Sequence, residues 1–162
     1  MRLLSFPSGM MDAGYKSPPS HEVEATADVF HPEGRKVLVV DDYDDAREMY
    51  AEFLEFLGYE VQTARDGQEA VELARESHPD VILMDLSLPV LSGWDATWQL
   101  KTDETTRDIP VMALTGHVFA SSSEKARAVG CDAFLTKPVL PDTVADQIQA
   151  LLKKTGSKPP SR

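Results

Sequence analysis

The sequence predicts an α/β fold in which helices cover both faces of a parallel sheet. Two observations support this prediction. Between residues 36 and 154, short apolar runs alternate with stretches of helical periodicity, which is typical of repeated βαβ units. Some runs, such as VLVV at 37–40 and VILM at 81–84, contain only apolar residues, as expected of parallel strands buried on both faces. We therefore expect five βα units in a doubly wound sheet.

The individual strands and helices follow from these runs and from the residues at their ends. We expect strands at residues 36–42, 59–64, 80–86, 109–116 and 131–138. We expect helices at residues 45–58, 67–77, 92–102, 121–130 and 140–154. Gly58 and Gly130 should end the first and fourth helices, because glycine readily adopts the left-handed conformation found just after a helix.

The first helix should turn one apolar side toward the sheet. The predicted members of this side are Met49, Phe53, Leu54, Phe56 and Leu57. Acidic residues stand where the first and last helices begin. We expect Asp44 or Asp45 to cap the first helix and Asp142 to cap the last, since a carboxylate can accept hydrogen bonds from the free amides of a helix start.

The chain has room for one domain and two tails. Its 162 residues fit one ordinary domain, and an apolar content of 42% is enough for a core. Residues 1–34 are rich in Pro, Ser, Gly and Glu and lack a sustained period, so we expect a flexible N-terminal tail. One Gly and two Pro residues near the other end indicate a disordered tail at 155–162. The domain itself is expected at residues 35–154.

The negative charge of the chain argues against two classes of partner. The net charge is −11, whereas binding to nucleic acids or to anionic membranes through charge requires clustered Lys and Arg. No apolar run is long enough to span a bilayer, and LLSF near the N-terminus is too short for a secretory signal. A single cysteine excludes a disulfide framework within the chain. We expect a cytoplasmic protein with no nucleic-acid partner and no membrane partner.

Side chains of complementary charge stand at the ends of four expected strands. They are Asp41 and Asp42 in the first strand, Asp85 in the third, Thr115 in the fourth and Lys137 in the fifth. Because ligands of such sheets bind at the carboxyl ends of the strands, we expect these residues to converge there. Neighbouring carboxylates disfavour joint ionisation unless a cation lies between them, and Mg²⁺ prefers oxygen ligands. A carboxylate beside Mg²⁺ and a lysine can attack phosphorus and form an aspartyl phosphate.

Four motifs make the sequence resemble the receiver domain of response regulators, the phospho-accepting module of two-component signalling. They are VVDD at 39–42, MDLSLPVLSG at 84–93, ALTG at 113–116 and LTKP at 135–138. Their order and spacing match the family over about 120 residues. The resemblance implies a flavodoxin-like (βα)5 fold with strand order 2-1-3-4-5. It also implies a phosphohistidine donor, carried by a sensor histidine kinase or a histidine phosphotransfer protein.

The resemblance assigns roles to the residues at the strand ends. Asp85 is implied to be the phosphoacceptor, and Lys137 is implied to pair with the phosphoryl group. The bond between Lys137 and Pro138 is expected to be cis. Thr115 and Phe134 are implied to be the switch residues. A downstream protein of unknown identity would then bind the face formed by the fourth helix, fifth strand and fifth helix.

A Mg²⁺ site is also implied by the resemblance. Its implied ligands are Asp41, Asp42, Asp85 and the backbone carbonyl of Ser87. Ser87 weighs against one alternative, a Mg²⁺-dependent phosphatase with an aspartyl nucleophile, because those enzymes usually carry a second Asp at this position. Another alternative is a pseudo-receiver that binds a partner without phosphorylation. No output domain is expected after the receiver, so signalling is expected to proceed through protein–protein contact, as an end effector or as a phosphorelay intermediate.

Five further residues invite a functional interpretation, and most have a simpler one. Trp94 and Trp98 share a face of the third helix and are interpreted as packing or rim residues rather than as a partner site. Cys131 is expected to be a buried apolar residue that opens the fifth strand, and His78 to be solvated. For His117 two interpretations stay open: it tunes the access of water to the phosphoryl group, or it is an ordinary exposed histidine.

Overall fold

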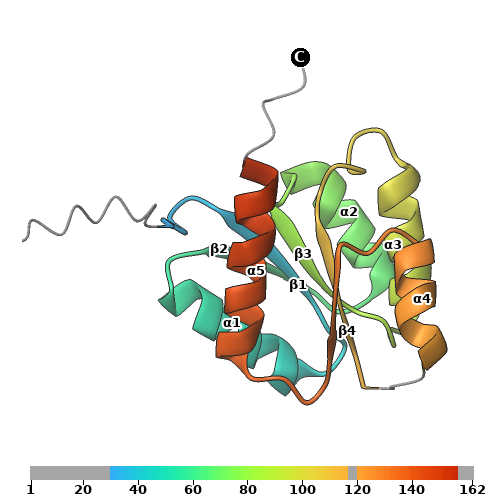
Figure 1. Cartoon of the computed structure of the whole chain (residues 1–162), viewed down its shortest axis with the longest axis horizontal. Coiled ribbons are helices and arrows are strands. Elements are labelled where there is room, and N and C mark those ends of the chain that lie inside the picture. Colours follow the sequence, from blue (N-terminus) through green and yellow to red (C-terminus); the bar gives the residue numbers. More distant parts are fainter. Residues whose placement is uncertain (1–29, 117–119, 157–162) are drawn as a thin grey trace, which may run out of the picture.

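In the described part of the chain, five parallel strands form one sheet in the order β2-β1-β3-β4-β5; four helices connect them and a fifth follows the last strand (Figure 1). The computed structural model describes residues 30–116 and 120–156. The strands are β1 (Lys36–Val40), β2 (Glu60–Ala64), β3 (Val81–Asp85), β4 (Val111–Thr115) and β5 (Ala133–Thr136). The helices are α1 (Asp44–Phe56), α2 (Gly67–Ser77), α3 (Gly93–Thr102), α4 (Ala120–Ala128) and α5 (Pro141–Gly156). The predicted flavodoxin-like class and its strand order are confirmed.

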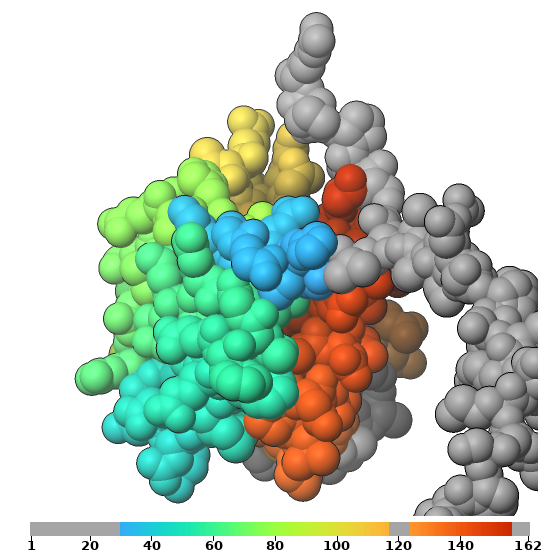
Figure 2. Space-filling model, turned by 90° about the vertical axis from the view of Figure 1, so that its left-hand side faces the viewer, coloured from blue at the N-terminus to red at the C-terminus, as the bar shows by residue number. Residues whose placement is uncertain are grey.

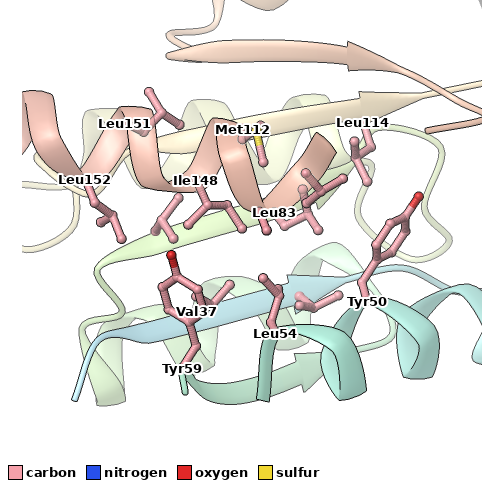
Figure 3. Close-up of a cluster of buried hydrophobic side chains, with 14 residues drawn as sticks. Val37, Tyr50, Leu54, Tyr59, Leu83, Met112, Leu114, Ile148, Leu151 and Leu152 are labelled. Carbon is pink, nitrogen blue, oxygen red and sulfur yellow. The ribbon is translucent and has the colours of Figure 1, made fainter. Parts of the chain in front are cut away.

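Two apolar clusters hold the helices on the two faces of the sheet. Because successive side chains of a strand point to opposite faces, Val37 and Val39 join the cluster beneath α1 and α5, which Figure 3 shows. Leu38 and Val40 join the cluster beneath α2 and α3. Full burial of one such side chain contributes roughly 1.5–3 kcal/mol relative to exposure. The all-apolar strands of the sequence are therefore explained by helices on both sides.

The apolar side predicted for α1 is wrong in part. Phe56 is 86% exposed and Met49 is 43% exposed. The buried residues of α1 are Arg47, Tyr50, Ala51 and Leu54, which follow the spacing i, i+3, i+4, i+7 of one helix face. The predicted set spans a wider arc of the helix, so that only one edge of it reaches the sheet.

The predicted helix caps are also wrong. Tyr43 holds the N-cap position of α1 without a side-chain cap, and Asp44 and Asp45 lie inside the first turn. Asp44 instead pairs with Arg47. The last helix begins at Pro141, a residue suited to a first helical position, so Asp142 again lies inside the helix. The glycine predictions hold, since Gly58 and Gly130 follow their helices with φ of +103° and +96°.

The two ends of the described chain pack onto this domain. Phe30 lies with its ring centroid 6.3 Å from that of Tyr59, against the cluster beneath α1 and α5. At the other end, α5 continues through Gly156. Residues 1–29 and 157–162, which make up most of the two predicted tails, lie outside the described residues. Within the described ranges, the structure contains no helix with the length and apolarity needed to cross a membrane.

Candidate functional site

The register of the strands brings four strand ends together at one edge of the sheet. Val40 in β1 is paired with Met84 in β3, so Asp41 and Asp85 follow at one level. Asp85 is paired with Leu114, and Thr115 follows in β4. Thr115 is itself paired with Thr136, which places Lys137 one residue further on. The predicted convergence therefore follows from the sheet alone.

Three carboxylates form a compact acidic cluster at this edge. One oxygen each from Asp41, Asp42 and Asp85 lies within 4.8 Å of the others. Asp41 and Asp85 are 1% and 6% exposed, whereas Asp42 is exposed. Like charges held so close in a partly buried place disfavour joint ionisation. The donor set and its spacing fit a hard divalent cation such as Mg²⁺.

Lys137 supplies positive charge to the two buried acids. Its Nζ lies 2.5 Å from Oδ2 of Asp41 and 3.0 Å from Oδ2 of Asp85. Burial lowers the pKa of Lys137, but the hydrogen bonds and negative charges of the two aspartates outweigh burial, so its pKa is raised. The backbone N–H of Lys137 donates to the carbonyl of Thr115 at 2.7 Å. The bond to Pro138 is cis, as predicted.

Asp85 is held from both sides at the end of β3. Its Oδ1 accepts a hydrogen bond from the backbone N–H of Ser87 at 2.8 Å, while Oδ2 faces Lys137. Burial raises the pKa of Asp85, and these two donors and the charge of Lys137 offset that effect only in part. The result is an oriented carboxylate whose charge is only partly compensated by the protein.

Arg47 is a feature of the site that the sequence interpretation missed. Its guanidinium is buried on α1, with Nη1 donating to the backbone carbonyl of Asp41 at 2.9 Å and Nη2 paired with Asp44. The backbone N–H of Tyr43 donates to Oδ1 of Asp41 at 2.9 Å. Arg47 therefore fixes the main chain where β1 passes into the acidic loop. Its place on the buried face with Tyr50 and Leu54 is the signal that could have revealed it.

The connection from β3 to α3 is tightly shaped. Leu91 donates its N–H to the carbonyl of Pro89 at 2.7 Å, which closes a three-residue turn around Val90 with φ of +64°. A Cβ atom at Gly93 would lie 2.0 Å from the backbone carbonyl oxygen of Asp85. Glycine is therefore required for the start of α3 to rest on the backbone of Asp85.

The two predicted switch residues lie on neighbouring strands. Thr115 is buried at the end of β4. Phe134 in β5 is paired with Ala113, so it shares a face of the sheet with Thr115 two positions away. Phe134 is half-buried and lines a hollow of about 280 Å³ together with Ala126 of α4. His117, for which two interpretations stayed open, lies outside the described residues.

The remaining singled-out residues lie away from this edge or differ from expectation. Trp94 is half-buried, with Nζ of Lys125 at 4.7 Å from its ring centroid, and Trp98 is 57% exposed. His78 is exposed, as predicted. Cys131 is only half-buried and precedes β5 rather than opening it, because the first paired residue of that strand is two positions later. Burial raises the pKa of its thiol to about 11.

The sequence of this chain is similar to those of known proteins. A sequence model of the response regulator receiver domain matches residues 37–149. The chain belongs to the response regulator receiver family. The receiver is 39% identical over 118 residues to the polar-differentiation response regulator DivK of Brucella ovis, with 73% of this chain and 96% of the relative covered.

Solved receiver structures share the fold. The chemotaxis protein CheY4 of Vibrio cholerae matches with a TM-score of 0.69 and 33% identity, over 72% of this receiver and 98% of that chain. The receiver domain of the sensor histidine kinase PA1611 of Pseudomonas aeruginosa matches with a TM-score of 0.69 and 32% identity, over 74% and 98%. That structure has a magnesium ion coordinated in its active site cleft.

Proposed function

We propose that this receiver accepts a phosphoryl group on Asp85 from a phosphohistidine, with Mg²⁺ bound by the neighbouring carboxylates. One observation carries the proposal: the ammonium of Lys137 lies between the carboxylates of Asp41 and Asp85, beside the third acid, Asp42. This grouping unites a nucleophile, a cation for the phosphoryl oxygens and an acidic place for a metal ion.

The proposed step is a transfer between two side chains. An oxygen of the Asp85 carboxylate attacks phosphorus, a new O–P bond forms, and the P–N bond to the donor histidine breaks with its electron pair returning to the imidazole. The ammonium of Lys137 can stay paired with the transferred phosphoryl group, because it lies 3.0 Å from Oδ2 of Asp85 on a flexible side chain. The N–H of Ser87 keeps the other carboxylate oxygen in a fixed orientation. The receiver is thus a phosphoryl acceptor rather than an enzyme that turns over substrate.

The residues present fit the proposed metal. Asp41, Asp42 and Asp85 offer oxygen atoms within 4.8 Å of one another, and Ser87 adjoins Asp85, so its carbonyl is the proposed fourth protein ligand. Bound Mg²⁺ would supply charge neutralisation at the phosphoryl oxygens. The magnesium in the receiver of PA1611 supports this assignment. Asp42, the exposed member, is the acid most open to solvent and to an entering ion.

Thr115 and Phe134 are the proposed switch. Phosphorylation adds negative charge and acceptor oxygens at Asp85, and a hydroxyl at the end of the adjacent strand can respond to them. A modification shifts a conformational equilibrium only through different interactions with the two states, and Thr115 is proposed to provide that difference. Phe134, on the same face, is proposed to follow it. The face of α4, β5 and α5 is then the proposed contact surface for a downstream protein.

Two alternatives are less well supported. A phosphatase with an aspartyl nucleophile needs an acid–base group near Asp85, but the residue two positions later is Ser87, whose N–H is used to hold the carboxylate. A pseudo-receiver would need none of the acid cluster, yet the three acids and Lys137 are all in place. A sensor kinase or phosphotransfer protein is proposed as the donor, since the relative DivK is named a response regulator. A cytoplasmic location is also proposed.

Phosphoryl labelling tests the proposed acceptor. We expect acetyl phosphate with Mg²⁺ to add one phosphoryl group to the wild type, read by intact mass, and chelation of Mg²⁺ to reduce labelling at least tenfold. Asp85→Asn should remain unlabelled, while the control Asp146→Asn, an exposed acid on α5, should label normally. Labelling of Asp85→Asn at the wild-type rate would refute the acceptor assignment.

A further inference from the structure

An apolar groove lies between α1 and the loop that joins β5 to α5. It is lined by Ala46, Met49 and Tyr50 of α1 and by the segment from Lys137 to Pro141, and its volume is about 720 Å³. The hydroxyl of Tyr50 donates to the carbonyl of Val139 at 3.0 Å, so its polar atom is already satisfied. Figure 2 faces the side of the molecule on which α1 and the start of α5 adjoin. The groove therefore offers mainly apolar contact area, with few polar groups that an occupant would have to hydrogen-bond.

Two large side chains of the groove are open to solvent. Met49 is 43% exposed and Leu140 is 68% exposed. Phe53 and Pro141 extend the same apolar surface into an adjoining hollow of about 540 Å³, which shares Met49 with the groove. A continuous exposed apolar surface of this kind often marks a place where another segment binds.

The rim of this surface is acidic. Asp45, Glu48 and Glu52 line the adjoining hollow. They are exposed and follow one another at spacings of three and four residues, so they lie along one side of α1. An occupant should therefore present apolar side chains to the groove and positive charge to the rim. A second copy binding through the same face would place these acidic rims against each other, which charge repulsion opposes.

The N-terminal residues of the chain have the complementary composition. The sequence MRLLSFPSGMM at 1–11 carries Leu3, Leu4 and Phe6 within four residues, and Arg2 is its only charged side chain. This apolar, basic stretch contrasts with the net charge of −11 of the whole chain. Its composition therefore fits both the groove and the rim.

The connecting chain is long enough to reach the groove. Phe30 packs against the cluster beneath α1, which also contacts Phe53. The groove thus lies within about one helix length of Phe30, roughly 20 Å for the 13 residues of α1. The residues between Phe6 and Phe30 have a root-mean-square span of roughly 25–30 Å if they behave as a flexible chain. A linker matched to its span gives an effective concentration in the millimolar range.

We propose that residues 2–6 dock in the groove between α1 and the β5–α5 loop. Leu3, Leu4 and Phe6 occupy the apolar groove, and Arg2 lies at the acidic rim. Since Lys137 forms part of the groove wall and contacts Asp85, the docked segment borders the proposed phosphoryl site. Only this last consequence rests on the proposed function.

Paramagnetic broadening in the full chain tests the docking. A nitroxide attached through Ser5→Cys, in a Cys131→Ser background, should broaden the amide signals of residues 45–53 and of Val139 and Leu140, and leave those of residues 67–77 sharp. Uniform broadening, or none, overturns the proposal. Broadening that appears only between spin-labelled chains and separate isotope-labelled chains indicates a second copy as the occupant, and this outcome also overturns it.

Charge exchange tests the placement of Arg2. Arg2→Glu should lower the ratio of docked to undocked chains roughly two- to fivefold, the effect of one exposed ion pair. Adding Glu48→Lys to this variant should restore the wild-type ratio. The control Lys16→Glu, made in the wild type, should leave the ratio unchanged. Absence of restoration overturns the assigned orientation.

The docking experiment and the labelling experiment fail independently. Broadening is measured without Mg²⁺ and without a phosphoryl donor. A failure to label Asp85 therefore does not affect the docking proposal. Conversely, normal labelling of Asp85 without selective broadening supports the proposed function and refutes the docking of residues 2–6.

Discussion

The charged side chains of the site differ in whether they contact other side chains or the main chain. Asp41, Asp85 and Lys137 meet through their charged groups. Arg47 instead donates to the backbone carbonyl of Asp41, a buried acceptor that would otherwise lack this donor. A buried polar group left without a partner costs roughly 1–3 kcal/mol. Arg47 is therefore expected to support the position of an acid that it does not neutralise.

Arg47→Met tests this role. We expect the free energy of unfolding to fall by roughly 1–3 kcal/mol in urea denaturation, and Mg²⁺ affinity measured by titration to fall severalfold under conditions where the variant is folded. The matched control is Arg75→Met, which removes a half-exposed ion pair with Asp103 and should cost less than about 1 kcal/mol. Unchanged Mg²⁺ affinity in Arg47→Met would show that Arg47 stabilises the fold but does not position Asp41 for the metal.

At the scale of elements, the short connection from β3 to α3 positions the candidate acceptor. The turn around Val90 uses a positive φ that β-branched residues rarely adopt. Beyond it, Gly93 allows the first turn of α3 to contact the backbone of Asp85, and its N–H donates to the carbonyl of Leu86 at 3.2 Å. The backbone of Asp85, at the end of the strand, is thus in direct contact with the start of α3.

Gly93→Ala should force these two elements apart. Because the added Cβ meets backbone atoms rather than a flexible side chain, we expect a loss of roughly 2–4 kcal/mol in stability and slower labelling of Asp85 at a temperature where the variant is folded. Gly156→Ala is the control, since a Cβ there has no neighbour within 4 Å. A Gly93→Ala variant as stable as wild type would show that α3 can shift without cost.

At the scale of the whole molecule, the sheet brings together residues that are far apart in the chain. Lys137 lies 96 positions from Asp41 and 52 positions from Asp85. Parallel strands in neighbouring positions, with a common direction, bring their carboxyl ends together regardless of this separation. A cation that binds there binds only the folded chain, so it should stabilise the molecule as a whole.

Thermal unfolding in Mg²⁺ tests this linkage. At about 100-fold above its Kd, Mg²⁺ should raise the Tm of the wild type by roughly 5–10 °C relative to NaCl of equal ionic strength. Asp42→Ala removes one of three carboxylates and should abolish most of this rise, whereas Asp146→Asn should keep it. An equal rise in Asp42→Ala would place the stabilising Mg²⁺ elsewhere.

The limits of sequence interpretation are visible in α1. Periodicity located the helix and its final glycine, but it assigned Met49 and Phe56 to the buried side, and both are exposed. A wide apolar arc does not reveal which of its edges meets the sheet, since that depends on how the helix is rotated against α5 and β1. The buried Arg47 was missed for the same reason, because the face that it shares with Tyr50 and Leu54 was not identified as the buried one.

The amino-acid sequence alone was enough to predict the alternation of strands and helices, the family, and the residues that end each strand. These features are local, because composition and spacing along the chain express them directly. The folded molecule was needed to establish the contacts of Lys137 with Asp41 and Asp85, the backbone support by Arg47, and the groove beside α1. Each of these depends on distances between elements remote in sequence, which follow from sheet register and helix packing rather than from any single stretch of residues.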